Sequence, residues 1–200
     1  MTLAATVLSA ALGSLAHMRW NLGGLMSHLC VIGLMVWLWV ERDQVKRFGI
    51  LNGLGFCQGL SIGPLIQYVL STPGGEIVLG KAFFGTTILF ACFSGAALFS
   101  PRRSYLYLYA TLASGLSLLL YLQLAALLFP TAFGTSVLLY LGLLLFIGYV
   151  VYDTQMILEK VSLGDNDFVG HALELFVDFV AIFVRLLIIL QKLNKKKEKE

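Results

Sequence analysis

Two aspartates, Asp153 and Asp178, lie inside long apolar segments in the last third of the 200-residue chain. A charged side chain at the centre of a bilayer costs at least about 2.5–3.5 kcal/mol, so acidic residues at such positions usually serve a function. Two carboxylates in contact in apolar surroundings resist simultaneous ionisation and titrate as a coupled pair. We therefore interpret them as a proton-sensitive gate that holds two helices together while the pair shares a proton.

The spacing of the two aspartates allows this contact. The segments that carry them are expected to form an antiparallel helical hairpin that turns near Gly164. Asp153 lies eleven residues before the turn and Asp178 fourteen after it. At a rise of 1.5 Å per residue, the two carboxylates differ in depth by only about 5 Å. A buried hydrogen bond that only fixes helix packing is the alternative interpretation.

The segment that contains Asp178 carries further polar side chains. His171, Glu174, Asp178 and Arg185 follow at intervals of three, four and seven residues, which places them on one helical face. Glu174 suits either interfacial packing or the lining of a pore, and Arg185 could neutralise Asp178 or reach an interface. His171 is either a polar residue at a helix end or a pH sensor.

Calcium is the ion that these carboxylates suggest, as a permeant ion rather than a resident cofactor. Ca²⁺ takes six to eight oxygen ligands, and two aspartates with Glu174 supply too few for a tight metal site. Weak binding suits conduction, because a conducted ion must also leave. The loop 165–167 begins like a calcium-binding loop but lacks the later ligands, so we interpret it as a turn.

The composition indicates an integral membrane protein. Hydrophobic residues make up 58% of the chain and charged residues 12%, whereas soluble domains carry about 25% charged residues. The apolar runs are continuous, which favours helices over the short alternating strands of a membrane barrel. The three cysteines, Cys30, Cys57 and Cys92, show neither disulfide nor metal spacing and are expected to be small packing residues.

We predict an all-α membrane protein with about seven transmembrane helices. A single membrane domain is expected over residues 1–191 and a basic, solvated tail over residues 192–200. The first segment could instead be a signal peptide, although no basic residue precedes it. The predicted spans are Thr2–Met18, Leu22–Val40, Phe48–Leu70, Ile77–Phe99, Ser104–Phe129, Phe133–Leu158 and His171–Leu190.

The third predicted span is the most irregular. Gly55, Gly59 and Gly63 recur every four residues, a pattern that permits close contact between helices. Pro64 lacks a backbone donor and is expected to kink or break the helix there, together with Gly63. The segment is either a kinked, packed helix or a break that lines a polar cavity.

The basic residues leave two topologies open. The basic residues of the loops 41–47 and 100–104 lie on one side of the membrane, and the positive-inside rule makes that side cytoplasmic. Seven full spans place the basic tail on the opposite side, whereas six spans with a re-entrant last segment place it in the cytoplasm. The tail suits anionic lipid headgroups, an acidic partner or a simple stop-transfer role. Its basic residues are Lys192, Lys195, Lys196, Lys197 and Lys199.

Several motifs resemble the Bax inhibitor family of multi-spanning membrane proteins. They are SIGPLI (61–66), PRRSYLYL (101–108), YDTQMILEK (152–160), LGDNDFVGHALELFVDF (163–179) and the lysine-rich tail. The resemblance implies an endoplasmic reticulum protein that suppresses cell death and to which a calcium leak is attributed. Family members usually have a soluble stretch before the first span, whereas this chain begins almost inside it.

The same resemblance implies a seven-helix fold whose last helix is central and wrapped by the others. The pH-sensitive acidic pair of the family, shared by the sixth and last helices, falls on Asp153 and Asp178. For the basic tail, the resemblance implies calmodulin as the partner in plants and Bcl-2 family proteins as the partners in animals.

Three functions remain open at this point. The first is a pH-sensitive calcium leak, which the sequence does not separate from proton-coupled exchange. The second is a non-conducting adaptor that binds death regulators or calcium channels. The third is an intramembrane aspartyl protease, since Tyr152-Asp153 and Leu163-Gly164-Asp165 echo its paired motifs. Its second motif is incomplete and lies in a polar loop, so we expect no enzyme and no cofactor. No nucleic-acid-binding or phosphate-binding motif is present.

Overall fold

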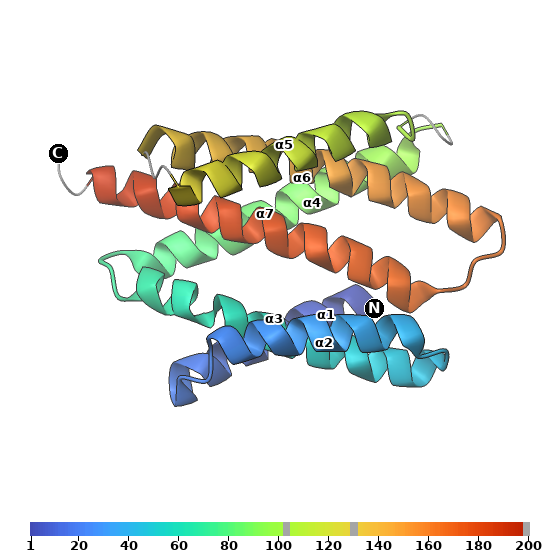
Figure 1. Ribbon diagram of the computed structural model, residues 1–200, viewed down its shortest axis with the longest axis horizontal. Helices are drawn as coiled ribbons and strands as arrows, with labels where there is room; N and C mark the ends of the chain where they lie inside the picture. Colours follow the sequence, from blue (N-terminus) through green and yellow to red (C-terminus); the bar gives the residue numbers. More distant parts are fainter. Residues whose placement is uncertain (102–104, 129–131, 198–200) are drawn as a thin grey trace. The chain divides into compact units, whose positions relative to one another are not determined.

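The computed structural model describes residues 1–101, 105–128 and 132–197, and all regular structure in these ranges is α-helical (Figure 1). The all-helical prediction is therefore confirmed. The helices are α1 (Thr2–Trp20), α2 (Leu25–Val40), α3 (Gln44–Leu70), α4 (Gly75–Phe99), α5 (Leu108–Leu128), α6 (Ala132–Ser162) and α7 (Phe168–Lys197).

Four stretches within these helices are long and apolar enough to cross a membrane. They are Gln44–Leu70, Gly75–Phe99, Leu108–Ala126 and Ser136–Ser162. The helix α2 is also apolar but has only 16 residues. At 1.5 Å per residue, a stretch of about 20 residues is needed to cross the hydrocarbon core. The chain is therefore a multi-pass membrane protein.

Some helix boundaries differ from the predicted ones. The helix α3 begins four residues before Phe48, because the carboxylate of Asp43 accepts the N–H of Val45 at 3.0 Å and caps it. The helix α7 continues to Lys197 instead of ending at Leu190, so the first part of the basic tail is helical. Several predicted features lie outside the described residues: Arg102, Arg103 and Ser104 of the basic turn, Phe129 and Pro130 after the fifth span, and Lys199 of the tail.

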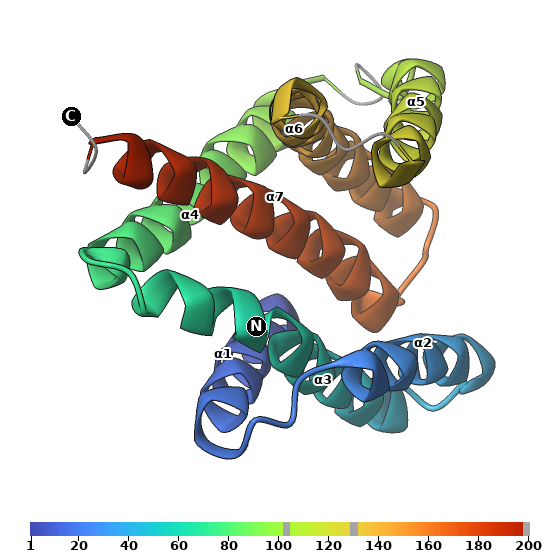
Figure 2. The ribbon, with the colours of Figure 1, turned by 60° about the vertical axis from the view of Figure 1, so that its left-hand side comes forward.

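The chain divides into two compact units, and α7 contributes to both. The first unit comprises Met1–Leu79 and Asp167–Phe176. Within it, α3 packs against α1 and α2, and the views in Figures 1 and 2 agree on this. The contact with α1 is made at backbone distance, as the glycine spacing predicts. A Cβ on Gly59 would collide with the carbonyl of Ala10, and one on Gly13 with that of Phe56.

The predicted break at Gly63 and Pro64 is absent. The helix α3 runs without interruption from Gln44 to Leu70 with Pro64 inside it. Pro64 cannot donate to the carbonyl of Leu60 four residues earlier. Gly23 lies against this carbonyl, since a Cβ there would stand 2.6 Å from the Leu60 oxygen. Gly23 thus covers the freed carbonyl, while its own N–H donates to His17 Nδ1 at 2.6 Å.

The second unit comprises Gly80–Asn166 and Val177–Glu200. Within it, α5 and α6 run side by side (Figure 2). Three edge-to-face ring pairs join α4 to α7: Phe83–Phe179 and Phe83–Phe183, with ring centres 6.1 and 6.4 Å apart, and Phe90–Phe179 at 5.7 Å. These contacts hold the part of α7 that carries Asp178 against α4.

Candidate functional site

The two aspartates of the predicted gate lie in the second unit. Asp153 is half-buried on α6, and Asp178 is 3% exposed on α7. Tyr149 lies one helical turn before Asp153, and its hydroxyl is within electrostatic range of both carboxylates. The structure therefore brings both aspartates into the electrostatic neighbourhood of one hydroxyl. Tyr149 was not predicted as part of the site, although its position four residues before Asp153 places it on the same helical face.

Arg185 lies against α6. Its Nη1 atom donates to the carbonyl of Ala181 at 3.0 Å, and its guanidinium carbon stands 4.4 Å from the centre of the Phe146 ring. A cation over an aromatic face is stabilised by the ring quadrupole. The guanidinium also occupies the space beside Gly142, where a Cβ would collide with Nε. The half-buried charge is thus accommodated by an aromatic ring and a glycine of α6.

The remaining residues of the predicted polar face belong to the first unit. His171 is buried and Glu174 half-buried, both in the first turns of α7. The helix is continuous over all four predicted positions, so their spacing along it is that of one helical face. The structure does not assign either residue to a metal, because no cluster of three potential ligand side chains occurs among the described residues.

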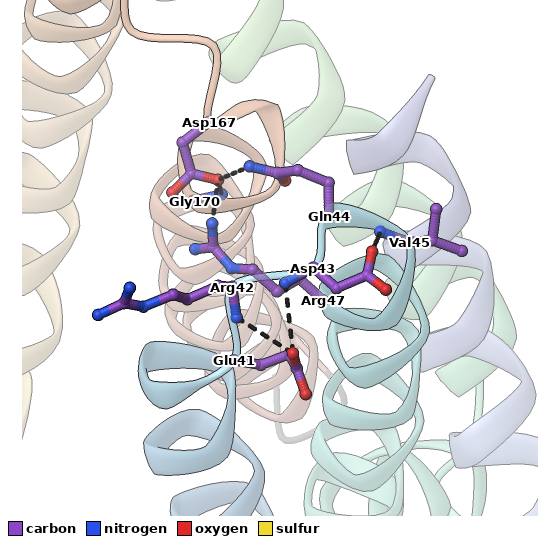
Figure 3. A network of polar contacts seen from close by, with 8 residues as sticks. All are labelled: Glu41, Arg42, Asp43, Gln44, Val45, Arg47, Asp167 and Gly170. Carbon is purple, nitrogen blue, oxygen red and sulfur yellow. Dashed lines mark hydrogen bonds and ion pairs between the residues drawn. The ribbon is translucent and has the colours of Figure 1, made fainter.

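A polar network fastens the start of α7 within the first unit (Figure 3). We call Asp167, Arg47, Gln44 and Gly170 the Asp167 network. Asp167 Oδ1 accepts from Arg47 Nη1 at 2.6 Å, from the Gly170 N–H at 3.0 Å and from Gln44 Nε2 at 3.4 Å. The side chains of Arg47 and Asp167 are 14% and 31% exposed. Asp167 is therefore both the cap of α7 and the anchor of α3.

The electrostatics of Asp167 favour its charged form. Burial alone raises the pKa of the carboxyl, but the hydrogen bond and charge of Arg47, with the Gly170 N–H and Gln44, outweigh it. The net result is a pKa below its ordinary value of 3.8. The network is therefore ionised throughout the physiological pH range. Sequence analysis assigned this loop only to turn formation, because the partner residues lie about 120 positions earlier.

The Asp-Thr-Gln motif that contains Asp153 also has a structural part. Gln155 is 2% exposed, and its Nε2 donates to the carbonyls of Ala97 at 3.0 Å and Pro101 at 3.2 Å. Its Oε1 accepts the N–H of Tyr105 at 3.3 Å. The amide thus satisfies backbone groups at the end of α4 and before α5. Thr154 donates to the carbonyl of Val150 at 2.7 Å and to Ser94 Oγ at 3.3 Å.

The helices and the buried acidic residues define a multi-pass α-helical membrane protein with ionisable groups inside its helical packing. Comparison with known proteins specifies it further. The family model described as "Inhibitor of apoptosis-promoting Bax1" matches residues 1–195. The chain belongs to this family, as its motifs indicated.

Similar proteins come from plants and animals. The chain is 44% identical to Bax inhibitor 1 of Arabidopsis thaliana, over 99% of this chain and 81% of that protein. It is 43% identical to Bax inhibitor 1 of Oryza sativa subsp. japonica, over 100% of this chain and 81% of the relative. The chain is 38% identical to Bax inhibitor 1 of Homo sapiens, over 96% of this chain and 82% of that protein.

Proposed function

We propose that this protein regulates cell death in the endoplasmic reticulum membrane by acting as a pH-sensitive calcium leak pathway. The cell-death role is supported by membership of the family described as "Inhibitor of apoptosis-promoting Bax1". It is also supported by the relatives named Bax inhibitor 1. The protein acts without catalysis and without a resident cofactor, and calcium is its permeant ion.

The observation that carries the leak mechanism is the position of the two aspartates. Asp178 is nearly inaccessible, and both carboxylates lie within electrostatic range of the same Tyr149 hydroxyl. In such surroundings a second negative charge is costly, so the pair retains a proton when the pH is low. One shared proton joins α6 to α7 and closes the pathway. Its loss leaves two repelling charges, which open the pathway and attract a divalent cation.

The conducted ion is held only weakly. Ca²⁺ prefers six to eight oxygen ligands, and two carboxylates supply fewer than that. A weak site favours passage, because an ion that binds tightly does not leave. A passive leak and proton-coupled exchange share this arrangement. They differ in whether calcium movement drives a proton in the opposite direction.

A non-conducting adaptor is the second candidate, and the basic end of α7 favours it. The helix extends through Lys197, and Lys192, Lys196 and Lys197 are exposed. A basic helical extension is suited to anionic lipid headgroups or to an acidic partner such as a Bcl-2 family protein or calmodulin. In this mechanism the aspartates only fix helix packing.

Reconstitution in liposomes distinguishes the two functions. Calcium influx is measured with an enclosed indicator between pH 5 and 8 for the unchanged chain and for Asp178→Asn. Asp43→Asn is the matched control, because Asp43 is an exposed helix cap and asparagine also caps. The leak mechanism requires an influx that rises with pH in the unchanged chain and in the control, with the pH dependence lost in Asp178→Asn. Folded protein that passes no calcium at any pH supports the adaptor.

A further inference from the structure

Two cysteines that are 27 positions apart meet between α2 and α3. The Sγ atoms of Cys30 and Cys57 are 3.2 Å apart, and both cysteines are free thiols. Cys30 is exposed and Cys57 is half-buried. Both residues lie in the first unit and take no part in the proposed ion pathway. The third cysteine, Cys92, lies on α4 in the other unit.

The thiol contact is fixed by the packing on both sides of it. One turn before Cys30, Ser27 accepts a hydrogen bond from Ser61 Oγ at 3.0 Å. One turn after Cys30, the Cδ1 atom of Leu34 lies 3.8 Å from the place where a Cβ on Gly53 would stand. Each step of three or four residues along α2 is thus matched by a step of four back along α3. This antiparallel register places the two sulfur atoms opposite each other on consecutive, well-defined turns.

We propose that Cys30 and Cys57 are a redox-active pair that a lipid or organic hydroperoxide converts into a disulfide joining α2 and α3. A disulfide bond is about 2.05 Å long, so the sulfur atoms must approach by roughly 1 Å. A hydroperoxide that partitions into the bilayer has access to Cys30, which is exposed on the apolar helix α2 next to the membrane-spanning α3.

The reaction has two steps that balance. The sulfur of Cys30 attacks the terminal oxygen of the hydroperoxide and the O–O bond breaks. The proton of the thiol passes to the departing alkoxide, so the products are a sulfenic acid and the alcohol of the oxidant. The sulfur of Cys57 then attacks the sulfenic sulfur and the S–O bond breaks. The departing hydroxide takes the proton of the Cys57 thiol and leaves as water as the disulfide forms. Two thiols are oxidised and one peroxide is reduced. Cys30 reacts first because it is the more exposed of the two.

The disulfide changes how the first unit can move. It closes a loop that contains the connection between α2 and α3. Since α3 also packs against α1 through glycines, the bond restricts how the three helices can move relative to one another. This inference is independent of the calcium pathway.

Mass spectrometry on the full-length protein in liposomes tests the proposal. The protein is treated with cumene hydroperoxide, free thiols are then alkylated, and peptides are analysed without reduction. The unchanged chain and Cys92→Ser should each yield a peptide pair linked through Cys30 and Cys57. Cys57→Ser should accumulate a sulfenic acid at Cys30 that dimedone traps, because the resolving thiol is absent. Cys30→Ser should show at least a fivefold slower loss of its Cys57 thiol.

Two results overturn the proposal. One is complete alkylation of both Cys30 and Cys57 after an exposure that oxidises a free peptide thiol under the same conditions. The other is a disulfide that involves Cys92 or joins two copies of the chain in place of the Cys30–Cys57 link. Both readouts come from the unchanged protein, so they do not depend on whether a variant folds.

Discussion

The Asp167 network yields a prediction whose magnitude can be worked out. Asp167→Asn retains a side-chain oxygen that can cap the Gly170 N–H, but it removes the charge that faces Arg47. Exposed ion pairs contribute up to about 1 kcal/mol, whereas breaking a buried pair costs about 3–5 kcal/mol. With Arg47 14% exposed and Asp167 31% exposed, this pair falls between these limits. We expect a loss of about 2 kcal/mol in the free energy of unfolding.

Asp167→Ala separates the cap from the charge. It removes both functions, and a lost helix cap costs about 1 kcal/mol. The expected loss is therefore about 3 kcal/mol, and the difference between the alanine and asparagine variants measures the cap. Asp43→Asn, at the exposed cap of α3, is the matched control and should change stability by less than about 0.5 kcal/mol.

The assay is reversible unfolding in mixed detergent micelles, followed by circular dichroism at pH 7. A double-mutant cycle with Arg47→Gln isolates the coupling between the two charges. The reasoning is refuted if the losses of Arg47→Gln and Asp167→Asn simply add. It is also refuted if the asparagine variant is as stable as the unchanged chain.

Three further predictions use the same unfolding assay. The charge contribution of Asp167 should be constant from pH 5 to 8 and be lost only as the pH falls below the ordinary carboxyl pKa of 3.8. A lowered pKa stabilises the fold above that value, and protonation removes this effect while leaving an oxygen that can cap the helix. Gly59→Ala should cost about 1–3 kcal/mol by collision with the Ala10 carbonyl, whereas Gly33→Ala, with open space around it, should be neutral or slightly stabilising. Gln155→Leu should cost about 2 kcal/mol, because it leaves the buried carbonyl of Ala97 and the half-buried N–H of Tyr105 without their hydrogen-bond partner.

The helices were predictable because their signal is local. Long apolar runs and the spacing of Gly55, Gly59 and Gly63 follow directly from the chemistry of the bilayer and from helix geometry. The effect of Pro64 was not predictable in the same way. A proline removes one hydrogen bond locally, but the sequence does not show which segment packs against the freed carbonyl. In the fold Gly23, between α1 and α2, lies there.

The polar contacts missed from the sequence share this cause. Cys30 and Cys57 carry no spacing motif, and their contact depends on the register of α2 against α3. Asp167 has the composition of a turn residue, and only the fold supplies Arg47. The buried position of Asp178 was anticipated, since an acidic residue in an apolar helix has few other places to go. Long-range pairing is thus the information that a single sequence lacks.

The backbone contact between α1 and α3 has a consequence for how the protein is made. The last residue of α1 leaves the ribosome 50 residues before the last residue of α3. At a synthesis rate of about 5–20 residues per second, α1 waits roughly 3–10 s for the helix that completes its packing. During this interval its small-residue face, suited only to close contact with another backbone, is open to other helices. Residues such as Gly13 should therefore make the early stage of folding, as well as the finished fold, sensitive to substitution.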